Sequence, residues 1–205
     1  MQSAGFEIVF ATDNNELCRD SHAVNFPSSK FKLCQIQDVE DREFAALRAP
    51  GPVDLLIGGP PCPPYSKSRF YLADKPRALA DPVGAATLTG YLRALKILKP
   101  RAFVLENVAG FGYKVHRAAL ELLVSTAEDL GYHVNHGKLN AADYGVPQIR
   151  ERYFVLGSLE GPIEMPTPSH SKARGSLLPP WVTAGDVLSD LDTEQNASDE
   201  GHFAG

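Results

Sequence analysis

The sequence predicts an α/β fold in which a mostly parallel sheet carries helices on both faces. Two observations predict it: short runs rich in β-branched and aromatic residues alternate with segments of helical periodicity, and several of these runs end at polar side chains. Strands that alternate with helices pair in parallel through right-handed crossovers. With 205 residues and 43% apolar content, the chain is long and apolar enough for one packed core.

Six short runs have the composition of strands, and most are bounded by turn-forming residues. The first run, Phe-Glu-Ile-Val-Phe-Ala, leads to Asp13, and the third leads into the pair Gly58 and Gly59. The predicted strands span residues 6–11, 32–36, 53–57, 102–105, 132–139 and 152–157.

Helix signals lie between these runs. Asn14 and Asn15 can cap a helix that reaches about Val24. Asp81 and Pro82 supply a cap and a proline in the first turn of a long helix, whose leucines recur at helical spacing. The other predicted helices span residues 40–48, 115–130 and 184–191, and the long helix spans 81–99.

Charge and cysteine content exclude several classes of protein. A formal charge of −5 does not suggest nucleic-acid binding, which would need a locally basic face. The aperiodic segment 63–80 offers one, because Lys67, Arg69, Lys75 and Arg77 lie there among aromatic residues. Separated cysteines without a C-x-x-C pair predict reduced thiols, and no histidine spacing predicts a metal site.

Polar side chains mark the ends of four predicted strands. Asp13, Gln35, Cys62 and Glu106 each lie at or just beyond the carboxyl end of a strand. Open α/β sheets bind their ligands along this edge. The sequence therefore predicts one site to which all four side chains contribute.

Three motifs in order carry a family resemblance. The stretch Gly58–Ser66 presents Cys62 between two proline pairs, Glu106–Val108 form a Glu-Asn-Val triplet, and residues 148–152 have the pattern Gln-x-Arg-x-Arg. Each motif alone is weak, but together and in this order they resemble the DNA (cytosine-5) methyltransferases.

The resemblance implies a Rossmann-like, S-adenosylmethionine-dependent methyltransferase fold. Residues 1–158 match a partial catalytic core of the family. Residues 159–205, largely irregular, are similar to the start of the target-recognition region that follows this core.

The resemblance also assigns chemistry to three residues. Cys62 matches the nucleophile whose thiolate adds to cytosine C6, so that C5 can attack the methyl group of S-adenosylmethionine. Glu106 matches the acid that bonds to or protonates N3, and Arg152 matches the cation that holds O2. Because C6 is inaccessible in a stacked duplex, the family flips the base out of the helix.

Further residues match the binding surfaces of the family. The positions expected to contact S-adenosylmethionine are Asp13, Asn14, Gln35, Ile36 and Pro61. The positions expected to contact nucleic acid are Ser66, Lys67, Arg69, Gln148 and Arg150.

Each of these residues also has a structural interpretation when it is taken alone. A cysteine after an apolar strand is commonly a small buried hydrophobe. Asp13 can be a helix cap, Glu106 can cap a loop, and Arg152 can form a surface ion pair with Glu151. The basic loop after Cys62 can be merely solvated.

The chain departs from the family pattern at two positions. Pro63 follows the cysteine where the family usually has glutamine, and proline removes a backbone donor. Gln35 stands where an aspartate usually meets the adenine amino group, although an amide oxygen can accept the same bond.

Several family elements have no counterpart in this sequence. They are the opening strand with its glycine-rich turn, most of the target-recognition region and the final core motif. The opening strand is central in the family sheet, so we expect a gap between two core strands. A complementing polypeptide is one source of the missing cofactor turn.

The leading hypothesis is methyl transfer to C5 of cytosine in double-stranded DNA, by an enzyme of restriction-modification or phage type. One alternative is a catalytically incompetent fragment or a DNA-binding subunit that needs a second chain. Another is a tRNA cytosine-5 methyltransferase. No apolar stretch approaches the roughly 20 residues of a membrane span and no leader is visible, so we expect a cytoplasmic protein without a membrane partner.

Overall fold

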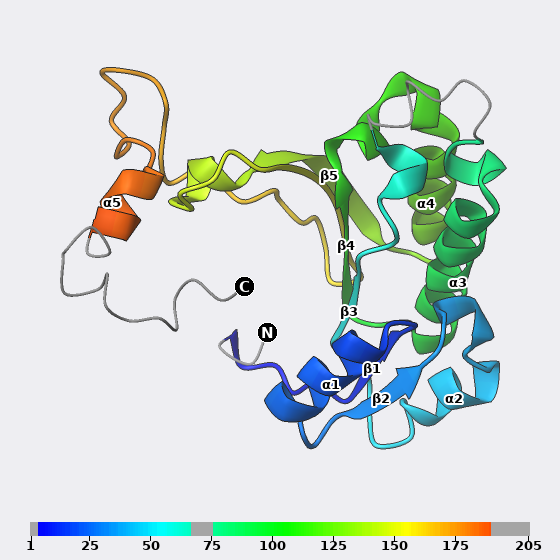
Figure 1. The fold of residues 1–205 in the computed structure, drawn as a ribbon. Coiled ribbons are helices and arrows are strands. Elements are labelled where there is room, and N and C mark those ends of the chain that lie inside the picture. Colours follow the sequence, from blue (N-terminus) through cyan, green and yellow to red (C-terminus); the bar gives the residue numbers. More distant parts are fainter. Residues whose placement is uncertain (1–3, 67–75, 190–205) are drawn as a thin grey trace. The chain divides into compact units, whose positions relative to one another are not determined.

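The computed structural model describes residues 4–66 and 76–189 (Figure 1). The chain divides into two compact units. The first joins Met1–Gly137 to Tyr153–Met165, and the second joins Lys138–Arg152 to Pro166–Gly205. The boundary expected near residue 158, between a catalytic core and a target-recognition region, stays a prediction.

In the described part of the chain, six strands form two sheets. A two-stranded parallel sheet pairs β1 with β2, and a four-stranded sheet has the order β3-β4-β6-β5, in which β3 and β4 are parallel. The strands are β1 (Phe10–Asp13), β2 (Lys30–Leu33), β3 (Leu55–Gly58), β4 (Ala102–Val108), β5 (His133–Asn140) and β6 (Glu151–Ser158). All six predicted strands are present, with shifted ends.

The largest shift is in the first strand, which begins at Phe10 rather than at residue 6 and includes Asp13. A hydrogen bond from Lys30 N to Val9 O (3.2 Å) lies just before the paired residues. Because the chain turns just before Lys30, residues ahead of Val9 have no part of β2 to pair with. Strand propensity alone cannot predict where β1 begins, because its first paired residue is determined by Lys30, which is distant in the sequence.

Among residues 4–66 and 76–189, five α-helices lie between or after the strands. The predicted caps are confirmed: Asn15 Oδ1 accepts from Leu17 N at 2.9 Å, and Asp81 Oδ1 accepts from Val83 N and Gly84 N, each at 3.0 Å. The helices are α1 (Glu16–Asn25), α2 (Asp41–Ala46), α3 (Pro82–Leu98), α4 (Arg117–Asp129) and α5 (Ala184–Leu188).

The main core lies between the four-stranded sheet and two helices. Figure 1 shows α3 and α4 on the same side of this sheet. Phe103 and Leu105 of β4 are fully buried in one cluster with Leu88 of α3 and Leu123 of α4. Side chains alternate across a strand, so Glu106 faces the opposite side of β4 from Leu105.

No ladder joins the two sheets within residues 4–66 and 76–189. β1 pairs only with β2, and β3 pairs only with β4. Yet Phe10 of β1 and Leu56 of β3 both pack against one apolar cluster that contains Phe44 of α2 and Leu98 of α3. The gap expected between two core strands is therefore present between β1 and β3.

Candidate active site

Cys62 lies in a tight turn that follows β3. The next three residues, Pro63–Tyr65, form a 3-10 turn in which Tyr65 N donates to Cys62 O at 2.9 Å. Pro63 is the first residue of this turn, where a backbone N–H would have no partner within the turn. The loss of that donor therefore costs the turn nothing. Cys62 itself is half-buried, and Pro64 and Tyr65 are buried.

Two close contacts through glycines hold the end of β3 and the turn after Cys62 against α3. A Cβ atom at Gly84 would lie 2.9 Å from Pro64 Cβ, and one at Gly58 would lie 2.4 Å from the Tyr91 ring. Real Cβ atoms do not approach so closely, so only glycine permits this packing. The backbone on both sides of Cys62 is thus held against α3.

Glu106 lies inside β4, not after it, because the strand continues to Val108. Its side chain is half-buried on the face that does not pack against α3 and α4. A Cβ atom at Gly59 would lie 3.9 Å from Glu106 Oε2. The carboxyl group thus lies beside the loop that leads to Cys62.

Asn107 connects the strand that carries Glu106 to the loop that carries Cys62, and it was not among the predicted site residues. It is completely buried, its Nδ2 donates to Pro60 O at 3.1 Å, and its Oδ1 accepts from Val108 N at 2.8 Å. The sequence held a signal for this role, since an amide at a core-facing position of an apolar strand needs buried partners.

Four of the five residues expected at the cofactor lie at or just after the ends of β1 and β2, and the fifth, Pro61, follows β3. Asp13 is exposed and its Oδ1 accepts from Asn15 N at 2.8 Å, while Asn14 is also exposed. Thr12 Oγ1 donates to Cys34 O at 2.8 Å, which holds the two strand ends together. Asp13 thus contributes to the start of α1, and its exposed carboxylate still has lone pairs for a ligand.

Gln35 and Ile36 lie at a 3-10 turn, Ile36–Asp38, and not in a strand as predicted for residues 32–36. Gln35 is exposed, and its Oε1 accepts from Gln37 Nε2. Pro61, expected on the same surface, is also exposed.

Arg93 of α3 fixes this turn and was missed in the sequence. Its Nη2 donates to three carbonyl oxygens, those of Ile36 at 3.2 Å, Gln37 at 3.0 Å and Val39 at 2.6 Å. These three hydrogen bonds satisfy backbone carbonyl groups that would otherwise need partners in a neighbouring strand. No sequence pattern singles out Arg93, because the same face of α3 also carries Thr89 and Lys96.

We expect Arg93→Leu to lower the free energy of unfolding by about 2 kcal/mol, because three carbonyl oxygens lose a charged donor. Urea denaturation measures this effect. Arg48→Leu is the matched control, since Arg48 is exposed and makes one long bond to Ile97 O at 3.4 Å. An equal loss in both variants would contradict the role given to Arg93.

The Gln-x-Arg-x-Arg motif belongs to the second unit. Gln148 and Arg150 are exposed, and Arg152 is half-buried with Nη1 donating to Glu151 O at 2.9 Å. Two expected contact residues of the loop after Cys62, Lys67 and Arg69, lie outside the described residues.

Asp143 forms hydrogen bonds to three residues of the C-terminal part of the second unit. Its backbone oxygen accepts from Ser169 N and His170 N, each at 2.9 Å, and its carboxylate accepts from Trp181 Nε1 at 2.9 Å. Residues 166–183 are thereby attached to the segment that carries the motif. No pattern in the sequence predicts this attachment.

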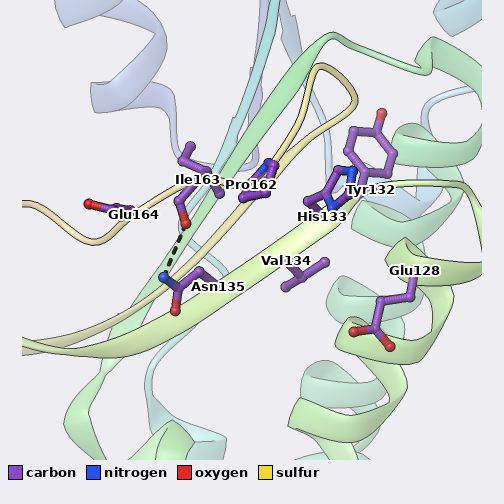
Figure 2. A pocket seen from close by; sticks show the side chains of 8 residues that line it. All are labelled: Glu128, Tyr132, His133, Val134, Asn135, Pro162, Ile163 and Glu164. Atoms are coloured by element: carbon purple, nitrogen blue, oxygen red, sulfur yellow. Dashed lines mark hydrogen bonds between the residues drawn. The ribbon is translucent and has the colours of Figure 1, made fainter.

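A pocket of about 440 Å³ lies in the first unit at the start of β5 (Figure 2). Asn135 Nδ2 already donates to Ile163 O at 3.0 Å across it. None of the expected site residues lines this pocket. The lining residues are Glu128, Tyr132, His133, Val134, Asn135, Pro162, Ile163 and Glu164.

The described part of the chain lacks two kinds of feature. Within it, His, Cys, Asp and Glu side chains form no group of three or more that could hold a metal ion. Within the same residues, no helix has both the length and the apolar character to cross a membrane.

Comparisons with known proteins agree on one family. The family model for C-5 cytosine-specific DNA methylases matches residues 1–204. The type II methyltransferase M.SacI of Streptomyces achromogenes is 41% identical over 167 residues, which are 80% of this chain and 42% of that protein. M.AquIA of Picosynechococcus is 33% identical over 208 residues, which are 92% of this chain and 82% of that protein.

Solved structures give the same fold. A DNA modification methyltransferase encoded within an E. coli prophage has a TM-score of 0.66 and 25% identity, over 90% of this chain and 49% of that one. The Dnmt2 methyltransferase of S. pombe, at 22% identity and a TM-score of 0.57, supports the fold alone. The predicted Rossmann-like methyltransferase fold is confirmed.

The chain spans about half the length, or less, of M.SacI and of other curated type II methyltransferases that it matches, and four fifths of M.AquIA. The three motifs occur in the order that the family resemblance required, and the family model covers nearly every residue. The chain belongs to the C-5 cytosine-specific DNA methylase family.

Proposed function

We propose that this chain carries the catalytic core of a DNA (cytosine-5) methyltransferase of restriction-modification or phage type. The supporting observation is the hydrogen bond from Asn107 to Pro60, which ties the strand bearing Glu106 to the loop bearing Cys62. A structural role for Cys62 alone would not need a carboxyl group beside its loop. The relatives named as type II methyltransferases favour DNA over tRNA as the substrate.

Three side chains have separate proposed roles in methyl transfer. The Cys62 thiolate forms a bond to C6 of a flipped cytosine, and the electron pair of the C5–C6 double bond moves to C5. Glu106 bonds to or protonates N3, where negative charge would otherwise collect, and Arg152 takes the family role of binding O2. C5 would then take the methyl group as the methyl–sulfur bond of the donor breaks and S-adenosylhomocysteine leaves. Water would take the C5 proton, and Cys62 would leave as a thiolate as the C5–C6 double bond reforms.

S-adenosylmethionine is the proposed methyl donor and supplies an electrophilic methyl group. The ends of β1 and β2 fit a nucleoside: Asp13 presents an exposed carboxylate for ribose hydroxyls, and Gln35 an exposed amide for the adenine edge. Asn14, Ile36 and Pro61 complete the expected contacts. In DNA binding, Ser66, Gln148 and Arg150 retain their proposed roles as contact residues.

A direct test measures transfer of labelled methyl groups from S-adenosylmethionine to double-stranded DNA and, in a parallel arm, to tRNA. We expect incorporation into DNA as 5-methylcytosine. Incorporation into tRNA alone would replace the proposal by the tRNA alternative. Binding of the methyl donor and DNA without any transfer would support the catalytically incompetent alternative.

We further propose that a complementing polypeptide can supply the strand and glycine-rich turn that bring cofactor binding to full strength. The support is the gap between β1 and β3 together with α1, which has no buried residue and exposes Leu17 and Val24. A parallel strand there would pair with both edges, and its following helix would cover apolar surface.

Equilibrium dialysis with labelled S-adenosylmethionine tests this partner. A polypeptide with an apolar strand, a glycine-rich turn and a helix, added at increasing concentration, is expected to lower the Kd for the methyl donor. A control polypeptide with proline inside the strand cannot pair and should have no effect. Identical affinity with both polypeptides would contradict the proposal.

A further inference from the structure

We propose that Tyr65 is a positioning residue for the nucleophile. Its ring is buried, and its backbone carbonyl lies directly against Gly110, a contact that we call the notch. This packing determines the position of Cys62 relative to β4, the strand that carries Glu106. This inference rests on the proposed function. It adds a residue whose side chain need not touch the substrate, the methyl donor or the reacting atoms.

The notch at Gly110 is defined by a very close approach. A Cβ atom at Gly110 would lie 2.1 Å from the Tyr65 carbonyl oxygen and 3.3 Å from its carbonyl carbon. Any other residue at this position would push the Tyr65 backbone away, because the obstacle is main chain rather than a flexible side chain. Gly110 follows the Glu-Asn-Val triplet by two residues, so the notch moves with the strand that carries Glu106.

The ring of Tyr65 is fixed on two sides. Its centroid lies 4.8 Å from that of Phe111 and 5.5 Å from that of His116, both in edge-to-face arrangements. His116 Nδ1 lies 2.7 Å from Gly110 O, so the histidine secures the notch as well as the ring. Tyr65, Phe111 and His116 are each no more than 1% exposed.

A displacement of Tyr65 reaches Cys62 through a short and stiff connection. The two residues between them are prolines, whose φ angles are locked. The bond from Tyr65 N to Cys62 O, at 2.9 Å, closes the turn on the other side. With Pro64 also packed against α3, the turn has little freedom to absorb a shift, so Cys62 must move with Tyr65.

The hydroxyl group of Tyr65 has no part in this role. It is buried and has no hydrogen-bond partner among the described residues. Burial, followed by the charge of Asp81, raises the pKa of Tyr65 to about 12, so the hydroxyl stays protonated at neutral pH. Tyr65→Phe should therefore keep the positioning function, whereas Tyr65→Leu should lose the ring contacts.

The test compares Gly110→Ala with Gly137→Ala, whose new Cβ atom would meet only Met165 at an ordinary 3.7 Å. Covalent capture of Cys62 on 5-fluorocytosine DNA is timed in the full chain, with any complementing polypeptide present in all samples. A nucleophile displaced by 1 Å can cost about 10²-fold in rate. We expect capture to slow by at least about tenfold in Gly110→Ala, with an unchanged Kd for DNA.

The thiol itself supplies a readout that does not depend on methyl transfer. Alkylation of Cys62 by iodoacetamide, followed by mass spectrometry, is normalised to the exposed Cys18 of the same molecule. Gly110→Ala and Tyr65→Leu should change this ratio, whereas Tyr65→Phe and Gly137→Ala should preserve it. If the wild-type chain failed to capture DNA while the ratios behaved as expected, the proposed function would be wrong and the positioning role would stand.

Two results would overturn the positioning role itself. One is a wild-type alkylation ratio in a folded Gly110→Ala or Tyr65→Leu variant. The other is loss of capture that is matched by equal loss of DNA affinity, which would indicate a general structural defect. If Gly110→Ala does not fold, as judged by circular dichroism, Tyr65→Leu decides the question because it adds no atom near the main chain.

Discussion

Cys62→Ala is expected to abolish covalent capture of 5-fluorocytosine DNA and to lower methyl transfer by at least about 10⁴-fold, because the variant lacks the thiol that adds to C6. DNA affinity should remain, since the side chain is small and half-buried. Denaturing electrophoresis of the covalent complex measures capture, and incorporation of labelled methyl groups measures transfer.

Cys18→Ala is the matched control for this prediction. Cys18 is an exposed thiol on α1 and is unrelated to the Glu106 strand. This control should behave as wild type in both assays. Persistent capture by Cys62→Ala would mean that the adduct forms elsewhere, and the proposed mechanism would then fail.

Glu106→Gln is expected to lower the rate of methyl transfer by about 10²-fold to 10⁴-fold, because the amide cannot supply the proton that N3 needs. The substitution preserves shape, so the affinities for DNA and S-adenosylmethionine should change little. A loss confined to kcat therefore separates a chemical role from a binding role. Single-turnover kinetics with saturating DNA gives this rate directly.

Glu160→Gln offers a control with the same chemical change. Glu160 is an exposed acid whose Oε1 accepts from Arg101 Nε at 2.7 Å, and it has no proposed role in catalysis. Its rate should equal that of the wild type. An unchanged rate in Glu106→Gln would instead assign Glu106 to the structure of the loop.

Local signals were predictable because they depend on neighbours in the sequence. Asn15 and Asp81 cap their helices through bonds to residues two or three positions later, and this spacing is visible in the sequence. The turn at Cys62 was also visible, because proline and glycine determine backbone shape wherever they occur. The family motifs then indicated which of these local features carry chemistry.

Residues that act over long distances in the sequence were missed. Arg93 reaches carbonyl oxygens more than fifty positions away, and its bonds to Ile36 and Gln37 turn an expected strand end into a 3-10 turn. Asn107 and Gly110 were likewise missed, because their roles depend on contacts with distant residues near Cys62: Asn107 bonds to Pro60, and Gly110 lies against Tyr65. No periodicity or propensity records such a partner, so three-dimensional packing was needed to find them.

The bond between Asn107 and Pro60 joins residues 47 positions apart, and it has a consequence for the order of folding. Closing the chain between such distant residues costs conformational entropy, so we expect this bond to form after the local turns and helices. The Cys62 turn should thus be one of the last segments to acquire protection during refolding. Pulsed hydrogen exchange at the Tyr65 amide would then report when β4 docks against β3. Cys62 would reach its final position only after these two strands have paired.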